Sequence, residues 1–452
     1  MRSPRHAAPA LAPMAVLALA FLFSGAATAS AQAPPPASLP ALVVPAAAQP
    51  SAHFDVEAAT DAYIAEIPAA EKARSDAYFE GGYWLILWDF LYGAAVSLAL
   101  LFFGWSAGMR DLAERLSRFK PVQTFLYWIQ FLAVTSALSF PLTVYQDFVR
   151  EHQYGLANQT FGPWLGDQVK ALLVAAVLGG LLVVALFGIV RRLPRTWWIW
   201  GSAATMAFLV FGMIIGPVYI TPLFNTVTPL RDARVTGPIL QMARANGIPA
   251  NDVYEVDESR QSKRISANVS GFGGTMRISL NDNLLRRGSL PEIEAVMAHE
   301  MGHYVLNHIY KMLMFFFIVV VAAFAYLRWA LRVTLARWGG RWRIRGVGDT
   351  AVLPLAALLV SIYGFVMTPV TNTFVRVQEV EADMFGLNAS AQPDGMAQAA
   401  VHLSEYRKMS PGRLEEWIFY DHPSGRNRIH AAMQWKAYHL ENICPPAGAP
   451  RP

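Results

Sequence analysis

The chain has 452 residues, of which 54% are hydrophobic and only 15% are charged; soluble proteins carry fewer apolar and more charged residues. The formal net charge of +5 does not indicate nucleic-acid binding, because the basic residues cluster beside apolar segments, as membrane topology requires. The single cysteine excludes an internal disulfide framework and a cysteine-rich zinc site. These numbers predict a protein whose surroundings are a lipid bilayer.

Residues 1–31 are typical of a secretory signal peptide. A basic start and an apolar core precede small residues at 29–31, where a signal peptidase would cut. The alternative is that this segment stays as an uncleaved first span. Residues 32–82 follow, and their Ala/Pro-rich beginning predicts an extended, mobile tether.

Six further apolar segments are long enough to cross a bilayer, for which a helix needs about 20 residues. They cover residues 84–106, 125–145, 171–190, 197–219, 312–327 and 351–370. The first four form one membrane region, 83–220, and the last two form a second, 312–370, around an Arg-rich loop. Lysine and arginine gather in the loops after the first, third and fifth spans, which places these loops in the cytoplasm. The polar regions after the fourth and sixth spans then face the periplasm.

The first polar region, 221–311, alternates short elements. We expect a helix over 234–246, strands over 253–256 and 276–280, and a strand-like stretch between the two strands. Ser289 and Glu292, with a proline between them, form a capping box. This box predicts the start of another helix.

The new helix carries the sequence His299-Glu300-Met301-Gly302-His303 in an otherwise apolar stretch. His299 and His303 share one face of a helix, so both rings can bind one zinc ion. Glu300 lies where it can take a proton from a zinc-bound water. The alternative is a buried helix whose histidines are satisfied by neighbours, which would leave the Glu300 carboxylate buried without a partner. The motif therefore predicts a zinc hydrolase with one zinc ion per chain.

A third zinc ligand has to come from the second polar region, 371–452. This region holds Glu379, Glu381 and Asp383. On a helix Glu379 and Asp383 share one face while Glu381 points away. Glu379 could then bind zinc and Asp383 could brace a ligating histidine. An ordinary acidic surface helix fits the spacing equally well.

The segments HEMGH, NH, EVEAD and DHPSGRNRI resemble those of the integral-membrane zinc endopeptidases of the CAAX prenyl protease type. The resemblance begins near Tyr83 and extends into the C-terminal region. It implies an α-helical multispan membrane protein with an α+β zincin-like (gluzincin) metalloprotease domain, whose helices enclose a water-filled chamber. It also implies a catalytic domain facing the cytosol, as in the eukaryotic members, which conflicts with the distribution of positive charge.

The same resemblance implies residue roles. Glu379 corresponds to the third zinc ligand, and Asp383 to an aspartate behind a ligating histidine. His422 corresponds to a histidine that stabilises the oxyanion, and Arg428 to an arginine that orients that site. A donor aimed at developing negative charge suits such a transition state. Without the resemblance, His422 is more simply a loop histidine.

An edge strand that pairs with substrate is also implied by the resemblance. Asn268 would take the place of a family asparagine, although a shifted register would put Ser266 there. Pairing of an extended peptide with a strand edge needs no particular side chain.

We therefore expect a membrane-embedded zinc endopeptidase of the bacterial inner membrane that cuts peptide or protein substrates, without a stable protein partner. Quality control of membrane or exported proteins is the expected role. The alternative is a non-proteolytic transporter or binding protein with a structural zinc site. Such a site usually has four protein ligands, whereas only three candidates are found.

Overall fold

The computed structural model describes residues 39–270 and 276–440. In these ranges, six helices are long and apolar enough to cross a membrane, which confirms the predicted number of spans. The helices are α3 (Ala69–Phe102), α5 (Lys120–Val144), α7 (Phe161–Arg192), α8 (Trp197–Ile215), α12 (His308–Trp338) and α13 (Leu353–Ser390). Short π-helical turns, Tyr145–Arg150 and Gly216–Ile220, extend α5 and α8.

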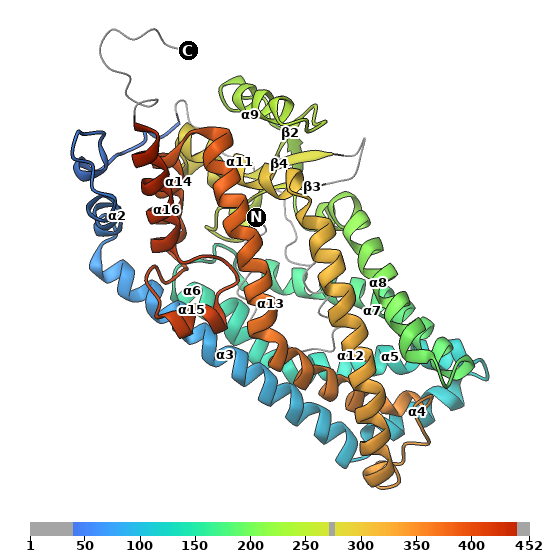
Figure 1. Ribbon diagram of the computed structural model, residues 1–452. Helices are drawn as coiled ribbons and strands as arrows, with labels where there is room; N and C mark the ends of the chain where they lie inside the picture. The colour runs from blue at the N-terminus through green and yellow to red at the C-terminus, as the bar shows by residue number, and fades with distance from the viewer. Residues whose placement is uncertain (1–38, 271–275, 441–452) are drawn as a thin grey trace.

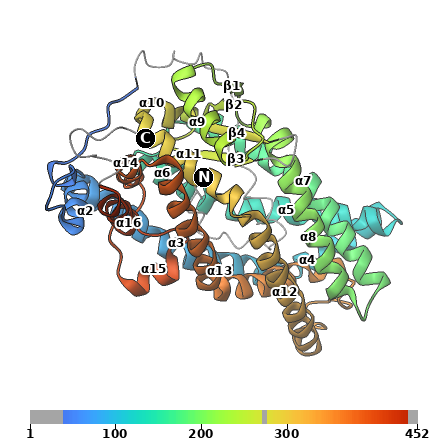
Figure 2. The same cartoon turned by 45° about the horizontal axis from the view of Figure 1, so that its top comes forward.

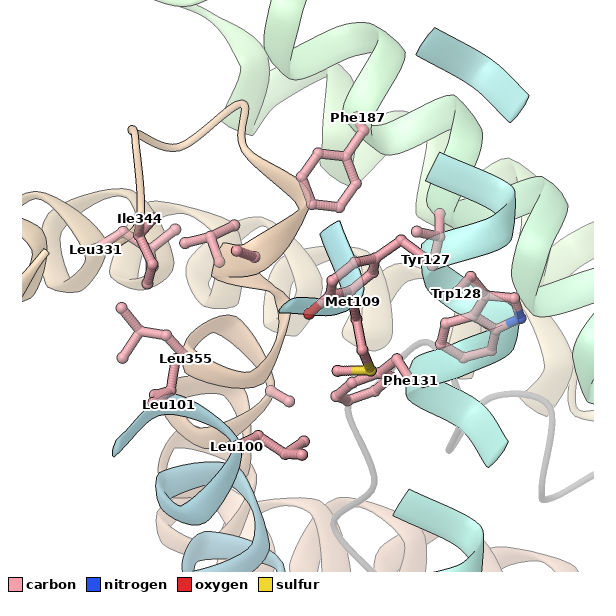
Figure 3. Close-up of a cluster of buried hydrophobic side chains, with 14 of the residues drawn as sticks. Leu100, Leu101, Met109, Tyr127, Trp128, Phe131, Phe187, Leu331, Ile344 and Leu355 are labelled. Carbon is pink, nitrogen blue, oxygen red and sulfur yellow. The ribbon is translucent and has the colours of Figure 1, made fainter. Parts of the chain in front are cut away.

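A buried apolar cluster holds the spans together at one end of the molecule (Figure 3). It combines Trp128 and Phe131 of α5 with Phe187 of α7 and Leu331 of α12. Gly179 of α7 lies against the indole of Trp128, where an added Cβ would come within 2.5 Å of the ring. Only glycine allows α5 and α7 to approach this closely.

The three basic loops meet at this same end. Helix α4 (Trp105–Leu116) follows the first span, and its Arg110 pairs with Asp349 at 2.7 Å. Arg110 also donates to the Arg343 carbonyl in the loop after α12. Arg191, at the end of α7, donates to the carbonyl of Gly348. The loops that carry the excess positive charge therefore lie together, far from the sheet (Figure 1).

A small mixed sheet lies at the opposite end (Figures 1 and 2). Its strands are β1 (Val227–Pro229), β2 (Val253–Val256), β3 (Ala267–Ser270) and β4 (Arg277–Asn281), in the order β1-β2-β4-β3. Strands β2 and β4 are parallel, and β3 is an edge strand antiparallel to β4. The expected strands and the expected helix, now α9 (Ala233–Ala245), are confirmed to within about a residue, whereas β1 was not predicted.

Helix α11 (Leu290–Val305) packs between this sheet and the C-terminal helices. Buried Ile293, Met297 and Met301 of α11 join Ile278 and Leu280 of β4 in one apolar cluster. The remaining helices of this end are α2 (Val56–Ala65), α6 (Glu151–Gln153), α10 (Asp282–Arg287), α14 (Pro393–Leu403), α15 (Arg413–Phe419) and α16 (Gly425–Tyr438).

The N-terminal segment departs from the predicted mobile tether where it is described. Ala48 is completely buried and belongs to the cluster formed by α2, α14 and α16. The buried ammonium of Lys436 donates to the Ala48 carbonyl and pairs with Asp394. Residues 39–50 have little regular secondary structure but are docked, because the Lys436 ammonium offers their backbone a buried partner. The proposed cleavage site and the start of the tether lie outside the described residues.

Two boundaries also differ from the sequence expectation. Helix α3 begins at Ala69, inside the segment expected to precede the membrane region. Helix α13 continues without interruption to Ser390, past the expected end of the sixth span at residue 370. A membrane helix thus carries the polar residues beyond it as a rigid extension.

Candidate metal centre

Helix α11 begins at the predicted capping box. The Ser289 N–H donates to the Glu292 carboxylate at 2.8 Å, and the reciprocal bond to the N3 backbone completes the box. Seven and eleven residues beyond Glu292, His299 and His303 stand one turn apart on this helix. His299 is 1% exposed, so its ring is held by packing.

Helix α13 crosses α11 at very short range because glycines line the crossing. A Cβ on Gly386 would lie 3.0 Å from the backbone nitrogen of His299. A Cβ on Gly302 would lie 3.2 Å from Cα of Ala382. This backbone-to-backbone contact brings Glu379 of α13 to the two histidines.

His299, His303 and Glu379 form a compact cluster, and the structure thus brings the three predicted ligands together. The two histidine Nε2 atoms are 3.2 Å apart. Oε2 of Glu379 lies 3.3 Å from Nε2 of His299, and Oε1 of Glu379 lies 3.4 Å from Nε2 of His303. Ligand atoms bound about 2.0–2.2 Å from a tetrahedral zinc ion stand roughly 3.3–3.6 Å apart. The donor set and its spacing therefore fit one such ion.

The other nitrogen of His299 faces a buried ion pair. Nδ1 is 2.8 Å from Oδ1 of Asp383, and Asp383 is paired with Arg428 through both of its oxygens. Both side chains are buried, with 7% and 5% exposed. Asp383 thus lies behind His299, one of the three candidate ligands, and Arg428 pairs with the aspartate.

The pKa values of the two imidazoles are shifted in opposite directions. Burial lowers the pKa of His299, but hydrogen bonds to Asp383 and Glu379 outweigh it and raise the pKa to about 9. Burial lowers the pKa of His303 to about 4, with a further contribution from the charge on His299. Two rings this close do not both become positively charged, while the acidic partners favour one positive charge between them. A bound cation satisfies the same demand.

Glu300 and His422 border the cluster from different elements. Glu300 is 5% exposed, and its carboxylate is close enough to act electrostatically on His303 and Arg428. His422 has Nε2 at 3.3 Å from Glu379 and Nδ1 at 2.8 Å from Asp421. A carboxylate thus lies against each nitrogen of this ring.

The loop that supplies His422 is ordered by the start of α16. The Ser424 side chain caps this helix by accepting from the backbone N–H of Asn427. The cap places His422 just before the helix and Arg428 in its first turns. One short segment therefore delivers two of the predicted site residues.

Asn268 lies on β3, in register with Ser279 of β4. Strand β3 packs near α11 in both views (Figures 1 and 2). Asn268 thus lies on the edge strand that packs against α11, the helix that carries His299 and His303.

His308 is a residue that the sequence reasoning missed. Its Nδ1 lies 2.9 Å from Nδ1 of His303, and its Nε2 lies 3.0 Å from Glu381. The dipeptide Asn307-His308 just after the motif could have indicated this residue, but it served only as part of the family resemblance.

The chain is similar to known proteins over most of its length. Residues 229–436 match the model of peptidase family M48, and residues 56–226 match the CAAX prenyl protease N-terminal region, described as five membrane helices. The uncharacterized metalloprotease YhfN of Bacillus subtilis is 31% identical over 313 residues, which cover 68% of this chain and 74% of YhfN. The chain belongs to peptidase family M48.

Other relatives agree with this assignment. CAAX prenyl protease 1 of Saccharomyces cerevisiae is 35% identical over 209 residues, 44% of this chain and 45% of the relative. A CAAX prenyl protease 1 homolog of Arabidopsis thaliana is 28% identical over 350 residues, 74% of this chain and 80% of the relative. The crystal structure of S. mikatae Ste24p has the same fold, with a TM-score of 0.70 and 24% identity over 81% of this chain and 89% of that one.

The M48 protein is thus a multi-pass membrane metalloprotease that hydrolyses peptide bonds. Family membership confirms the predicted enzyme class and the resemblance to CAAX proteases, and it does not favour the non-proteolytic transporter. The predicted fold class, helical membrane spans with a small mixed domain, is confirmed by the fold shared with Ste24p.

Proposed function

We propose that the protein is a zinc endopeptidase whose metal is held by His299, His303 and Glu379. The observation that carries the proposal is the close approach of the candidate ligand atoms. The two Nε2 atoms are 3.2 Å apart, Oε2 of Glu379 lies 3.3 Å from His299, and Oε1 lies 3.4 Å from His303. Three protein ligands leave one coordination position for water or substrate, as catalytic zinc sites require. Zinc there would act as a Lewis acid and make water acidic enough to be a nucleophile near neutral pH.

The protein's own residues divide the proton chemistry. Glu300 takes the proton from the attacking water and later delivers it to the leaving amine. His422, flanked by Asp421 and Glu379, donates a hydrogen bond to the negative charge that develops on the carbonyl oxygen. Asp383 and Arg428 act behind His299 and keep its ring in place.

The substrate is an extended peptide segment that pairs with the edge strand β3. Main-chain hydrogen bonds to such an edge supply affinity without a demand on sequence, and Asn268 adds a polar side chain there. Relatives are named CAAX prenyl proteases, so a prenylated tail is one substrate to be tested. Our preferred role is removal of unfolded membrane or exported proteins in a bacterial inner membrane.

We place the basic end of the molecule in the cytoplasm and the metal centre on the periplasmic side. Support comes from the three basic loops, which contact one another at the end remote from the sheet. A reporter fused at the C-terminus tests this topology. Alkaline phosphatase activity is expected there, whereas fluorescence of a green fluorescent protein fusion without phosphatase activity would reverse the orientation.

The test of the catalytic proposal is Glu300→Gln, with Glu294→Gln as a matched control on the same helix. Glu294 accepts from Gln392 and is no part of the site. The full chain in detergent is supplied with zinc, an unfolded protein and a prenylated peptide. Glu300→Gln should retain one zinc ion and lose about 10²–10⁴-fold in cleavage rate, while the control keeps both. A wild-type protein that binds no zinc, or cuts neither substrate with zinc bound, would contradict the proposal.

A further inference from the structure

His308 links a predicted metal ligand to the protein surface. Its Nδ1 contacts Nδ1 of His303 at 2.9 Å, and its Nε2 contacts Oε2 of Glu381 at 3.0 Å. Lys311 donates to the same Glu381 oxygen at 2.6 Å. The His308 side chain is only 3% exposed, while those of Glu381 and Lys311 are 44% and 45% exposed.

A turn between two helices puts His308 in this place. Helix α11 ends at Val305 and α12 begins at His308. Asn307 between them has φ 57° and ψ 35°, a left-handed conformation that asparagine tolerates better than most residues. If α11 continued, positions 303 and 308 would point about 140° apart around the helix axis. The turn instead folds the His308 ring back against His303.

The role of His303 as a metal ligand determines which ring nitrogen of each histidine carries hydrogen. A histidine that binds a metal through Nε2 carries its hydrogen on Nδ1, so His303 donates through Nδ1. His308 must then accept at its own Nδ1, which leaves its hydrogen on Nε2. That nitrogen faces the Glu381 carboxylate, which can only accept when ionised. All three groups are satisfied by one arrangement.

The two ligand histidines are thus supported in different ways. His299 contacts a buried carboxylate directly, at Asp383. His303 reaches an exposed carboxylate, Glu381, only through a second imidazole. Partners that hold the outer nitrogen of a ligand histidine fix its ring orientation and raise its basicity.

We propose that His308 is a positioning residue that holds His303 in the orientation a metal ligand needs, and that Glu381 selects the nitrogen through which His308 accepts. The inference rests on the proposed zinc centre and assigns to His308 and Glu381 a role in retaining the metal. Lys311 pairs with Glu381 and neutralises its negative charge at the exposed end of this series of hydrogen bonds.

The experiment measures zinc release from the full chain in detergent, loaded with one zinc ion and mixed with excess chelating dye. His308→Phe keeps a ring but offers no acceptor, and should release zinc about 10–100 times faster than wild type. His308→Asn keeps an acceptor near the place of Nδ1 and should restore most of the retention. Glu381→Gln, at an exposed position that folding tolerates, should release zinc faster by a smaller factor. His152→Phe on α6, whose ring contacts the Phe148 carbonyl, is the matched control.

Thermal unfolding of the metal-free proteins separates positioning from a merely structural role. A structural role predicts a lower unfolding temperature for His308→Phe without metal, and no rescue by asparagine. Wild-type release rates in both His308→Phe and Glu381→Gln would overturn the inference while leaving the zinc centre intact. If wild type itself binds no zinc, the proposed function is wrong and the inference falls with it. If His308→Phe does not fold, the release rate of Glu381→Gln decides.

Discussion

Gly386→Ala perturbs the metal centre without touching any ligand. The new methyl group would lie 3.0 Å from the backbone nitrogen and 3.1 Å from Cα of His299. Carbon atoms pack best at about 3.5–4.0 Å, so α13 must move away from α11 by roughly half an ångström. Backbone atoms cannot rotate aside as a flexible side chain can.

The cost in stability and the cost in metal binding differ. Overpacking costs about 1–3 kcal/mol, and the better helix propensity of alanine returns about 1 kcal/mol. The net loss of folding free energy is therefore about 2 kcal/mol or less. Metal sites tolerate errors of only about 0.2 Å in ligand distance, and Glu379 moves with α13 while the histidines stay on α11. We expect zinc affinity to fall about 10–100-fold, as it does when a ligand's support is lost.

Zinc titration of the purified protein, with a competing chelator, measures this effect. Gly237→Ala on α9 is the control, because nothing lies within 4 Å of the added methyl group. A folded Gly386→Ala protein with wild-type zinc affinity would refute the reasoning. It would show that the helix crossing does not set the distance between the glutamate and the histidines.

Three further results are expected. Because the pKa of metal-free His299 is about 9 and that of His303 about 4, zinc displaces one proton between these values. Its affinity, followed by titration at several pH values, should fall about tenfold per unit of falling pH; no dependence between pH 5 and 8 would argue against this assignment. Asp383→Asn keeps an acceptor for His299 but leaves the buried Arg428 without its counter-ion. Competition with a chelator should therefore show zinc binding about 10–100-fold weaker. Unchanged binding would mean that Asp383 does not support the metal centre. Lys436→Met leaves Asp394 and the Ala48 carbonyl without their buried cation. The loss of about 3–5 kcal/mol should appear as a lower unfolding temperature in detergent, and an unchanged temperature would mean that the docked N-terminal segment contributes little stability.

Local signals decided much of what could be predicted. Each span is visible in its own run of apolar residues, because crossing a bilayer depends only on length and hydropathy. The helix at 290–305 was predicted from the Ser289 capping box, a contact between residues three positions apart. His299 and His303 could be paired for a similar reason, since four residues along any helix return to the same face.

The third candidate ligand, Glu379, could not be assigned from such local signals alone. Spacing alone allowed Glu379 and Asp383 to be an ordinary surface helix, and only the resemblance to a family favoured a site. What brings Glu379 to His299 is a crossing of two helices, made possible by Gly302 and Gly386. In the sequence these glycines are indistinguishable from many others.

The sequence by itself determined the membrane spans, the helix face that carries both histidines and the chemistry that its residues can perform. Only the tertiary structure decided which acidic residue approaches the histidines, that a left-handed Asn307 returns His308 to His303, and that residues 39–50 dock on Lys436. The physical reason is the distance along the sequence over which each interaction acts. Periodicity and capping act within one or two helical turns, whereas these contacts join segments whose approach depends on how whole helices pack.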